Sequence, residues 1–407
     1  MRLTRRTALM GAGSMTLTGM WSRPAVAASE VKFALITPLS GPWARGGLMM
    51  RQGAEIAIED INASGGIKAV GGAKVKLLLA DAGDSPDKAR NAAQRLVAEN
   101  PDLVGGVGCW LSSFTLAVTE VTERAGIPWL ANGFADQVTA RGFKNVFQTI
   151  VTSTQMSSVI QSTSLSMAKA ADRAPKKIAL LAENTPAALA TAKPLEAGYK
   201  ASGIDIVVNE VYTPPLSDAT PLVQKLRAAR PDMLVLLSVA VQDNKTFMDK
   251  LREFGLGPTR LPVIILGAQS ASPEFLKLVG PNNVEGVMGT FSNWPKPVHG
   301  ELVERLKKRY NEEWIGQDQI STYGDMWLLK EAAERSGSVD PAKIASTLRQ
   351  MDERGGIADY YSGGRIKFDD TGKLVEAGMV IIQWQDNKPV LVYPTGTDTV
   401  KVRWPKA

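Results

Sequence analysis

The chain has 407 residues, of which 44% are hydrophobic, and a formal net charge of +6. This length is long for one domain and typical of two, and the apolar content is ample for buried cores. One cysteine and one histidine, Cys109 and His299, exclude a disulfide framework and a thiolate metal cluster. We expect His299 in a surface loop, which leaves no histidine for acid–base chemistry.

The first 27 residues have the composition of an export signal. Arg5 and Arg6 precede a modestly apolar run, and Ala25-Val26-Ala27 is a small-x-small cleavage pattern. The segment resembles a twin-arginine signal, although Ala8 and Met10 depart from that pattern. Ordinary secretion is the alternative, and both routes predict a periplasmic protein cleaved near Ala27.

Removal of this segment would lower the charge of the chain. Residues 1–27 contain four arginines and no acidic residue, so the mature chain would carry +6 − 4 = +2. So small a charge argues against nucleic acid and anionic membrane as partners. No run of 18 or more apolar residues follows the segment, so we do not expect the mature chain to span a membrane.

Short β-branched runs alternate with longer helical runs through the first part of the mature chain. Such alternation, with continuously apolar strands, predicts parallel sheets covered by helices on both faces. The expected elements of this part are 32–36, 47–61, 73–80, 87–99, 103–107, 114–125 and 127–130. Helices are expected later at 298–314, 321–336 and 341–351, and β-strands after Arg365.

The strand pattern of the first part occurs a second time. Residues 177–181 echo 32–36, and Pro231-Asp232-Met233-Leu234 echoes Pro101-Asp102-Leu103-Val104. Chance similarity among apolar strands is the alternative to a repeat. A repeat predicts two doubly wound α/β lobes joined by a hinge, with a ligand cleft between them. We expect the N-terminal lobe to comprise 28–150 and 291–357 and the C-terminal lobe 151–290 and 358–407.

The segment Gly105–Thr115 joins an apolar strand to a helix. Its glycines permit a tight turn and close approach of the backbone to a ligand. Ser112 and Ser113 can cap the helix while their N–H groups remain available to an anion. The segment is therefore a candidate carboxylate-binding helix N-terminus, and a capped helix after an ordinary βα turn is the simpler interpretation of these residues alone.

An enzyme on a doubly wound sheet is the main alternative to a binding protein. Residues 105–108 lack the G-x-G-x-x-G spacing, and the sequence has no Walker lysine pattern, G-x-S-x-G elbow or C-x-x-C pair. Acid–base chemistry would depend on Asp81, Asp84 or Glu183, which have the positions of loop and cap residues. We therefore predict a protein that is not an enzyme and that uses no cofactor or metal.

Several motifs along the mature chain point to one family. The strongest is Ile61-Asn62-Ala63-Ser64-Gly65-Gly66-Ile67 at a helix end. Ser40-Gly41-Pro42 lies in the loop after the first strand, Asp81-Ala82-Gly83-Asp84 in a later loop, and Thr139-Ala140-Arg141-Gly142 in the passage to the second lobe. Together they resemble the type I periplasmic solute-binding proteins of ABC importers, specifically the branched-chain amino-acid-binding branch. The resemblance covers essentially the whole mature chain.

The resemblance implies a monomeric protein whose lobes close over a small carboxylate ligand, such as an amino acid. Its closed form would then dock on a membrane permease and ATPase. The resemblance also implies that Ser112 and Ser113 bind the ligand carboxylate, and that Asn132, Gly133 and Phe134 contact the same group. A ligand sensor of the same fold, serving a membrane receptor, is an alternative that the sequence does not separate.

Three departures from the family pattern bear on the ligand. Gln269 replaces the glutamate that holds the ligand ammonium in amino-acid binders, and Asn184-Thr185-Pro186 replaces a Tyr-Gly pair. A buried ammonium without a carboxylate is costly, so an aromatic or aliphatic carboxylate, or an amide, becomes a candidate ligand. The family disulfide is expected to be absent, with Cys109 a buried free thiol, because Gly83 stands at the partner position.

Three aromatic residues are candidates for shaping the cleft. Trp43 follows the Ser-Gly-Pro turn, Trp110 lies beside the carboxylate loop, and Tyr323 belongs to a Tyr-x-Asp segment that resembles one near the ligand in relatives. Packing in the core is the alternative for each of them.

Overall fold

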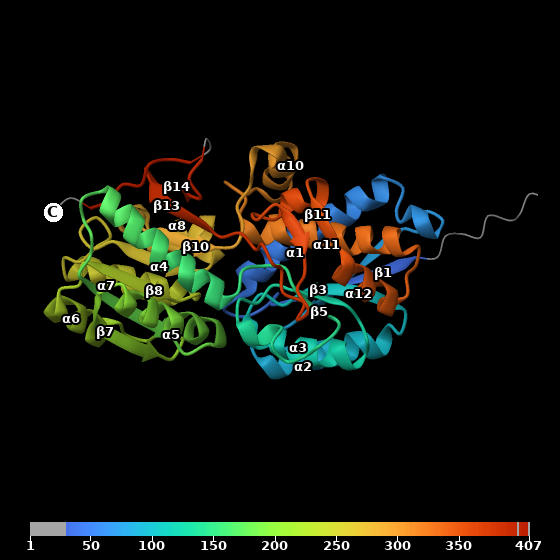
Figure 1. The fold of residues 1–407 in the computed structure, drawn as a ribbon, viewed down its shortest axis with the longest axis horizontal. Helices are drawn as coiled ribbons and strands as arrows, with labels where there is room; N and C mark the ends of the chain where they lie inside the picture. Colours follow the sequence, from blue (N-terminus) through green and yellow to red (C-terminus); the bar gives the residue numbers. More distant parts are fainter. Residues whose placement is uncertain (1–29, 397–398, 406–407) are drawn as a thin grey trace, which may run out of the picture.

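The computed structural model describes residues 30–396 and 399–405, which form two α/β lobes side by side (Figure 1). The expected fold class, two α/β lobes with parallel sheets, is thereby confirmed. The export segment predicted for residues 1–27 lies outside the described residues. None of the helices in the described ranges is long and apolar enough to cross a membrane.

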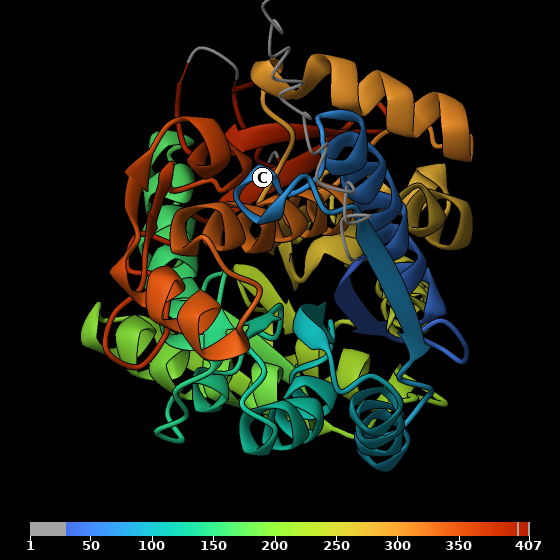
Figure 2. The same ribbon diagram turned by 90° about the vertical axis from the view of Figure 1, so that its right-hand side faces the viewer.

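The N-terminal lobe is a five-stranded parallel sheet between two layers of helices. Its elements are β1 (Val31–Thr37), α1 (Ala44–Ala63), β2 (Val75–Asp81), α2 (Pro86–Glu99), β3 (Leu103–Gly108), α3 (Ser112–Arg124), β4 (Trp129–Ala131), β5 (Val146–Gln148), α10 (Gly300–Tyr310), α11 (Gln317–Ser336) and α12 (Pro341–Gln350). The strand order is β2-β1-β3-β4-β5. Helices α1, α11 and α12 cover one face, and α2 and α3 cover the other (Figures 1 and 2).

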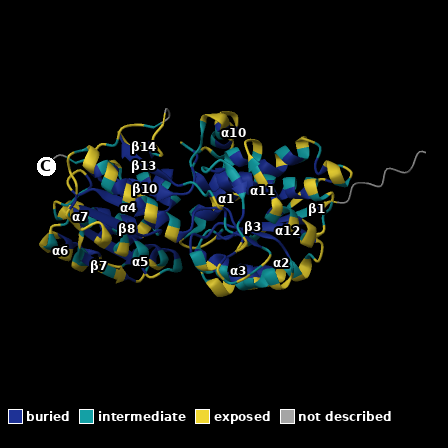
Figure 3. Ribbon diagram, in the orientation of Figure 1, coloured by how far each residue is buried: buried dark blue, intermediate teal, exposed yellow. Residues whose placement is uncertain are grey.

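The C-terminal lobe repeats this arrangement on a larger sheet. Its elements are α4 (Ser153–Ala170), β6 (Lys177–Glu183), α5 (Pro186–Ala201), β7 (Asp205–Tyr212), α6 (Thr220–Ala229), β8 (Met233–Leu237), α7 (Val241–Glu253), β9 (Val263–Leu266), α8 (Pro273–Val279), α9 (Pro281–Val284), β10 (Met288–Phe291), β13 (Val380–Gln385) and β14 (Lys388–Tyr393). The order is β14-β13-β10-β9-β8-β6-β7, with β13 and β14 antiparallel to their neighbours. The central strands of both sheets are buried, and exposed residues lie on the outer helices and on the edge strands β2 and β7 (Figure 3).

Local signals explain where several helices begin. The Ser85 hydroxyl accepts a hydrogen bond from the Lys88 N–H, and Pro86 is the first residue of α2. Asp340 caps α12 in the same way: its side chain accepts a hydrogen bond from the Lys343 N–H, and Pro341 is the first helical residue. Such caps satisfy amide groups that have no partner inside the helix.

The chain passes between the lobes three times, and one side chain joins the three segments. The Ser292 hydroxyl accepts a hydrogen bond from the Val151 N–H at 2.9 Å and donates one to the Gly378 carbonyl at 3.3 Å. Each of these residues belongs to a different crossing segment. The crossings therefore meet at Ser292, which makes this the position of the hinge.

The packing of residues after 357, the expected end of the N-terminal lobe, bears on the position of the last crossing. Tyr361, Ile366 and Leu374 are buried in the core of the N-terminal lobe, because the strand pair β11 (Asp352–Arg354) and β12 (Arg365–Lys367) packs there. We propose that the N-terminal lobe extends to about this point and that the crossing lies between Leu374 and β13.

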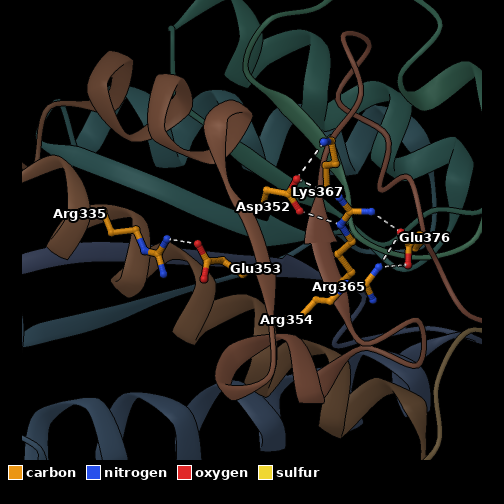
Figure 4. A network of polar contacts seen from close by, with 7 residues as sticks. All are labelled: Arg335, Asp352, Glu353, Arg354, Arg365, Lys367 and Glu376. Carbon is orange, nitrogen blue, oxygen red and sulfur yellow. Dashed lines mark hydrogen bonds and ion pairs between the residues drawn. The ribbon is translucent and has the colours of Figure 1, made fainter.

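A network of ion pairs fixes the β11–β12 pair to the segment just before this crossing (Figure 4). Asp352 accepts hydrogen bonds from Arg365 and Lys367 at 2.7 and 2.9 Å. Glu376 pairs with Arg365 and with Arg354, the latter at 2.9 Å. Each exposed pair contributes little to stability alone, so the network serves mainly to fix the position of this segment.

The close packing of the N-terminal sheet generates a stability prediction. A Cβ atom on Gly106 in β3 would lie 2.2 Å from the buried Trp129 ring, whereas a Cβ on Gly300 would meet nothing within 4 Å. We expect Gly106→Ala to lower the free energy of unfolding by about 1–3 kcal/mol through overpacking. Gly300→Ala, in an exposed first helical turn, should be neutral or stabilising by about 0.5 kcal/mol. Chemical denaturation of both variants measures this; equal losses would contradict the packing argument.

Candidate ligand-binding site

A pocket with about 470 Å³ of space, its open mouth included, lies between the lobes. Six of the nine residues predicted from the sequence line it: Trp110, Ser112, Ser113, Asn132, Phe134 and Gln269. The other lining residues are not among those nine: Leu111, Thr185, Pro186, Ala187, Val239, Ala268 and Gln317.

The start of α3 presents unpaired backbone donors to this pocket. The first amide within α3 that bonds back to the preceding turn is that of Thr115, which donates to the Leu111 carbonyl. Among the described residues, no acceptor reaches the N–H groups of Ser112, Ser113 and Phe114. Such groups, together with the helix dipole, favour an anion at this position.

The two serines do not cap α3, which corrects the expectation from the sequence. The N-cap residue is Leu111, and no side chain accepts a hydrogen bond at that cap. The Ser112 hydroxyl instead accepts a hydrogen bond from the Ala135 N–H at 3.1 Å. The helix start is thereby fixed to the loop after β4, and its amide groups remain without side-chain partners.

Trp110 forms one wall of the pocket in a constrained conformation. Its φ of 72° is in the left-handed region, which is uncommon for a residue other than glycine. Its indole Nε1 donates to the Asp318 carboxylate at 3.2 Å, and a Cβ on Gly46 would lie 2.3 Å from the ring. Gly46 therefore provides the space that the indole occupies, and Asp318 fixes the orientation of the ring.

Asp318 and its neighbour Gln317 begin α11. Asp318 is buried behind Trp110, and burial raises the pKa of its carboxyl to about 6, although hydrogen bonds from Trp110 and Gln317 oppose this rise. The Gln317 side chain accepts from the Ser292 N–H at 2.5 Å. The pocket wall is therefore joined through α11 to the hinge residue Ser292.

Asn132, Gly133 and Phe134 follow β4. The Asn132 Nδ2 donates to Asp325 at 2.8 Å, and its Oδ1 is buried without a partner among the described residues. A Cβ on Gly133 would lie 3.0 Å from the Ser112 Cα, so this residue contacts the α3 start although it does not line the pocket. Phe134 lines the pocket and packs against the core of the C-terminal lobe.

Gln269 lies on the opposite side of the pocket, after β9. Its side chain is only 3% exposed, and its Nε2 donates to the backbone carbonyls of Leu266 at 2.8 Å and Ser238 at 3.2 Å. Both amide hydrogens are therefore used inside the C-terminal lobe. No described donor bonds to its Oε1, so that oxygen is the polar atom that Gln269 can offer to a ligand.

A buried carboxyl lies behind this side of the pocket. The Glu183 oxygens accept hydrogen bonds from the Thr185 hydroxyl at 3.0 Å and the Val239 N–H at 2.9 Å. Burial raises the pKa of Glu183 to about 7, against these two hydrogen bonds. Glu183 thus positions two pocket residues without lining the pocket itself. In the sequence, Glu183 is recognisable only as a polar residue at the end of a strand.

Trp43 and Tyr323, two of the aromatic candidates, lie outside the pocket. Trp43 packs edge-on against Phe114, with ring centroids 5.7 Å apart. Tyr323 lies about 9 Å along α11 from the pocket residue Gln317 and on another face of the helix. Its hydroxyl donates to Asp60 at 2.9 Å. Packing, the alternative considered for both residues, is what the structure shows.

The two residue types that occur once in the chain are both buried. Cys109 is a buried free thiol, as expected, and burial raises its pKa well above the usual value. His299 is 3% exposed and stacks on Tyr360 with centroids 5.0 Å apart, so the expected surface position is wrong. Within the described ranges, no group of three or more metal-ligating side chains has the geometry to hold a metal ion.

Among the described residues, no charged side chain lines the pocket. Its polar lining consists of hydroxyl, amide and indole side chains, and its remaining lining residues are apolar. The nearby carboxyls of Glu183 and Asp318 are buried behind the lining. The arrangement can bind an anionic group through the N–H donors of α3 and an apolar body between the lobes, and it offers no carboxylate to a cation.

Two α/β lobes around such a pocket define a class, the two-lobed extracytoplasmic binding proteins. The sequence profile of the periplasmic binding protein family matches residues 30–389, and the chain belongs to this family. The family consists of substrate-binding proteins rather than enzymes.

One relative and two solved structures illustrate the similarity. The Leu/Ile/Val-binding protein homolog 7 of Brucella suis is 29% identical over 406 residues, covering 97% of this chain and 98% of that protein. The LivJ protein of Streptococcus pneumoniae, solved with isoleucine, has a TM-score of 0.75 at 20% identity, covering 89% of this chain and 98% of that one. A solute-binding protein of Rhodopseudomonas palustris, solved with 3,4-dihydroxybenzoic acid, has a TM-score of 0.74 at 22% identity, covering 92% and 98%.

The raised pKa of Glu183 generates a prediction about pH. Because the pKa of its carboxyl is near 7 in the folded protein and 4.5 for an ordinary glutamate, the folded state holds an extra proton between these values, and stability rises as pH falls through this window. Replacement by glutamine removes this dependence. We expect acidification from pH 8 to pH 5.5 to stabilise the unchanged protein relative to Glu183→Gln by about 2 kcal/mol.

Thermal denaturation of both proteins at several pH values measures this difference. Asp318 and Asp325 also have pKa values raised to about 6 by burial, and they contribute equally to both proteins. A constant difference between the two proteins from pH 8 to 5.5 would contradict a raised pKa for Glu183.

Proposed function

We propose that this protein is the substrate-binding subunit of an ABC importer and captures a small carboxylate between its lobes. The observation that carries the proposal is the set of unpaired N–H groups at the start of α3, which lie in an uncharged pocket. Several N–H donors and a helix dipole can bind one anion without a buried positive side chain.

The absence of a charged lining residue favours a carboxylate without an ammonium group. A zwitterionic amino acid would place its ammonium in a pocket whose described lining includes no carboxylate, and the resemblance to amino-acid binders implies that Gln269 replaces that acid. Burial of an unpaired ammonium is strongly unfavourable. The relatives of this fold include one solved with isoleucine and one with 3,4-dihydroxybenzoic acid, and the lining supports the second kind of ligand.

Capture would use closure of the lobes. Ser113 and Asn132 belong to one lobe and Gln269 to the other, so a ligand contacts both sets only when the lobes are closed. A ligand that binds the closed form better shifts the equilibrium toward it. Scattering curves that superimpose with and without a tight ligand would contradict this mechanism.

The location and partners are also part of the proposal. We propose export through the N-terminal segment with cleavage near Ala27, a monomeric mature protein in the periplasm, and delivery of the ligand to a membrane permease and its ATPase. Membership of the periplasmic binding protein family supports the location.

The proposal is tested first by a thermal-shift screen of the purified protein against amino acids, aromatic acids, short aliphatic acids and amides. A ligand at ~100 times its dissociation constant adds roughly 2.7 kcal/mol of stability. Stabilisation by a carboxylate supports the proposed function. Stabilisation by branched-chain amino acids alone would overturn the preference for ligands without an ammonium.

A pair of variants at Ser113 tests the charge of the ligand. Ser113 is in the first turn of α3, where an acidic side chain is favourable for folding. In the pocket, its charge would repel a carboxylate by about 4 kcal/mol at a separation of about 4 Å. We expect Ser113→Asp to fold normally and to weaken binding of the best carboxylate at least about a hundredfold.

The isosteric Ser113→Asn variant is the matched control, because it has the same size as the aspartate variant and no charge. It should retain most of the affinity measured by calorimetry. Equal losses in the two variants would show that size rather than charge is responsible, and would contradict an anion at α3.

A further inference from the structure

The side-chain donors around the pocket are directed away from it. The Trp110 indole donates to Asp318, and the Thr185 hydroxyl donates to Glu183. The amide groups of Asn132 and Gln269 donate to Asp325 and to backbone carbonyls, respectively. Outside the start of α3, the polar side chains of these walls therefore use their donors inside the protein.

The orientation of the Gln269 amide follows from its partners. The carbonyl oxygens of Ser238 and Leu266 can only accept hydrogen bonds. The Gln269 Nε2 lies 3.2 and 2.8 Å from them, so the amide cannot be reversed without placing three oxygens together. Its Oε1 is consequently an acceptor that has no described partner inside the protein.

A buried carboxyl group fixes the orientation of the Asn132 amide in the same way. The Asp325 carboxylate accepts from the Asn132 Nδ2 at 2.8 Å, from the Tyr361 hydroxyl at 2.8 Å and from the Thr149 hydroxyl at 3.3 Å. The Asn132 Oδ1 is left buried without a partner, and the side chain is 8% exposed. A buried polar atom without a hydrogen bond is unfavourable, so this oxygen is an unsatisfied acceptor beside the pocket.

The pocket is thus divided into a donor end and an acceptor part. Donors lie at the start of α3, while Gln269 on the facing lobe and Asn132 beside α3 offer acceptors. Resting on the proposed function, we propose that the ligand is a carboxylate that also carries a neutral hydrogen-bond donor, a hydroxyl or an amide N–H, which the Gln269 Oε1 accepts. Hydroxylated aromatic or aliphatic acids are the ligand class that this assigns.

These contacts specify two properties of the group that the ligand carries besides its carboxylate: this group has no charge, and it has a hydrogen to donate. An ether oxygen at the same position has no hydrogen to donate, so it would face the Gln269 oxygen unfavourably. An ammonium could donate, but its charge would lie in a pocket whose described lining has no carboxylate. A site built to hydrogen-bond a ligand hydroxyl rejects the analogue without it more strongly than an apolar site distinguishes a methylene.

The test uses ligands in matched sets on the mature protein. Each set contains a hydroxy acid, its O-methyl ether, the parent acid without the oxygen, and the corresponding amine; the 3- and 4-hydroxybenzoates and 4- to 6-carbon ω-hydroxy acids supply the sets. Calorimetry gives each dissociation constant. We expect the best hydroxy acid to bind at least about tenfold more tightly than the three other members of its set.

A variant assigns the preference to Gln269. In Gln269→Leu the acceptor is removed, and the preference for the hydroxy acid over its parent should fall to about twofold or less, while the parent acid binds as before or slightly better. Ser113→Asn is the control, since it should change the affinity of all members by the same factor and leave the preference intact. Because Gln269→Leu leaves two carbonyls without donors, the melting temperature of this variant is measured alongside. If the variant does not fold, the ligand sets measured on the unchanged protein still test the preference for hydroxy acids.

The outcomes separate this inference from the proposed function. Parent acids and ethers that bind as tightly as hydroxy acids would overturn the inference and leave carboxylate binding in place. Tightest binding by the amines would overturn the assignment of an uncharged hydrogen-bond donor to the ligand. Failure of every carboxylate would overturn both. A hydroxy-acid preference that survives in Gln269→Leu would overturn the role of Gln269.

Discussion

The amide N–H groups at the start of α3 need a hydrogen-bond acceptor, and the fold allows one to approach only from the pocket. The helix begins at Ser112 without a capping side chain, directly after a turn in which Trp110 adopts a left-handed conformation. Gly46 on α1 provides space for the Trp110 ring, and Asp318 on α11 fixes it. Three elements of the N-terminal lobe thus hold one helix terminus open toward the other lobe.

The facing lobe complements this terminus through its own internal bonds. Glu183 and two backbone carbonyls take up the hydrogens of Thr185 and Gln269, so this wall offers an amide oxygen and apolar groups. The lobes communicate through the hinge, where Ser292 contacts two crossing segments by its hydroxyl and Gln317 by its N–H. A ligand that moves Gln317 acts on a residue that is bonded directly to Ser292. A ligand that moves Trp110 acts on Asp318, which is bonded to Gln317 and through it to Ser292.

Much of the fold follows from patterns that are local in the sequence. Continuous apolar strands, the Ser85-Pro86 and Asp340-Pro341 helix starts, and the repeat of the first strand pattern are sufficient to predict the two lobes. The α3 start and Gln269 are recognisable as site candidates because each follows a strand at the end where such sheets bind ligands.

The features that sequence patterns do not predict depend on contacts between distant segments. Asp318 and Glu183 act through pocket residues from behind the wall, and the direction of the Gln269 amide depends on carbonyls that follow two different strands. The expected helix at 298–314 ends at Tyr310 because Asn311 adopts a left-handed conformation, and Trp314 instead packs against the C-terminal core.

The claim that the pocket is an anion site rather than a general apolar cleft is tested most directly by calorimetric titration of the mature protein with its best carboxylate and the methyl ester of that acid. The ester keeps the shape and the apolar body and lacks the charge. The account predicts binding of the acid and at least about a hundredfold weaker binding of the ester, because the unpaired N–H groups and the helix dipole act on a full negative charge. Equal affinities would contradict it and would assign the pocket to recognition by shape alone.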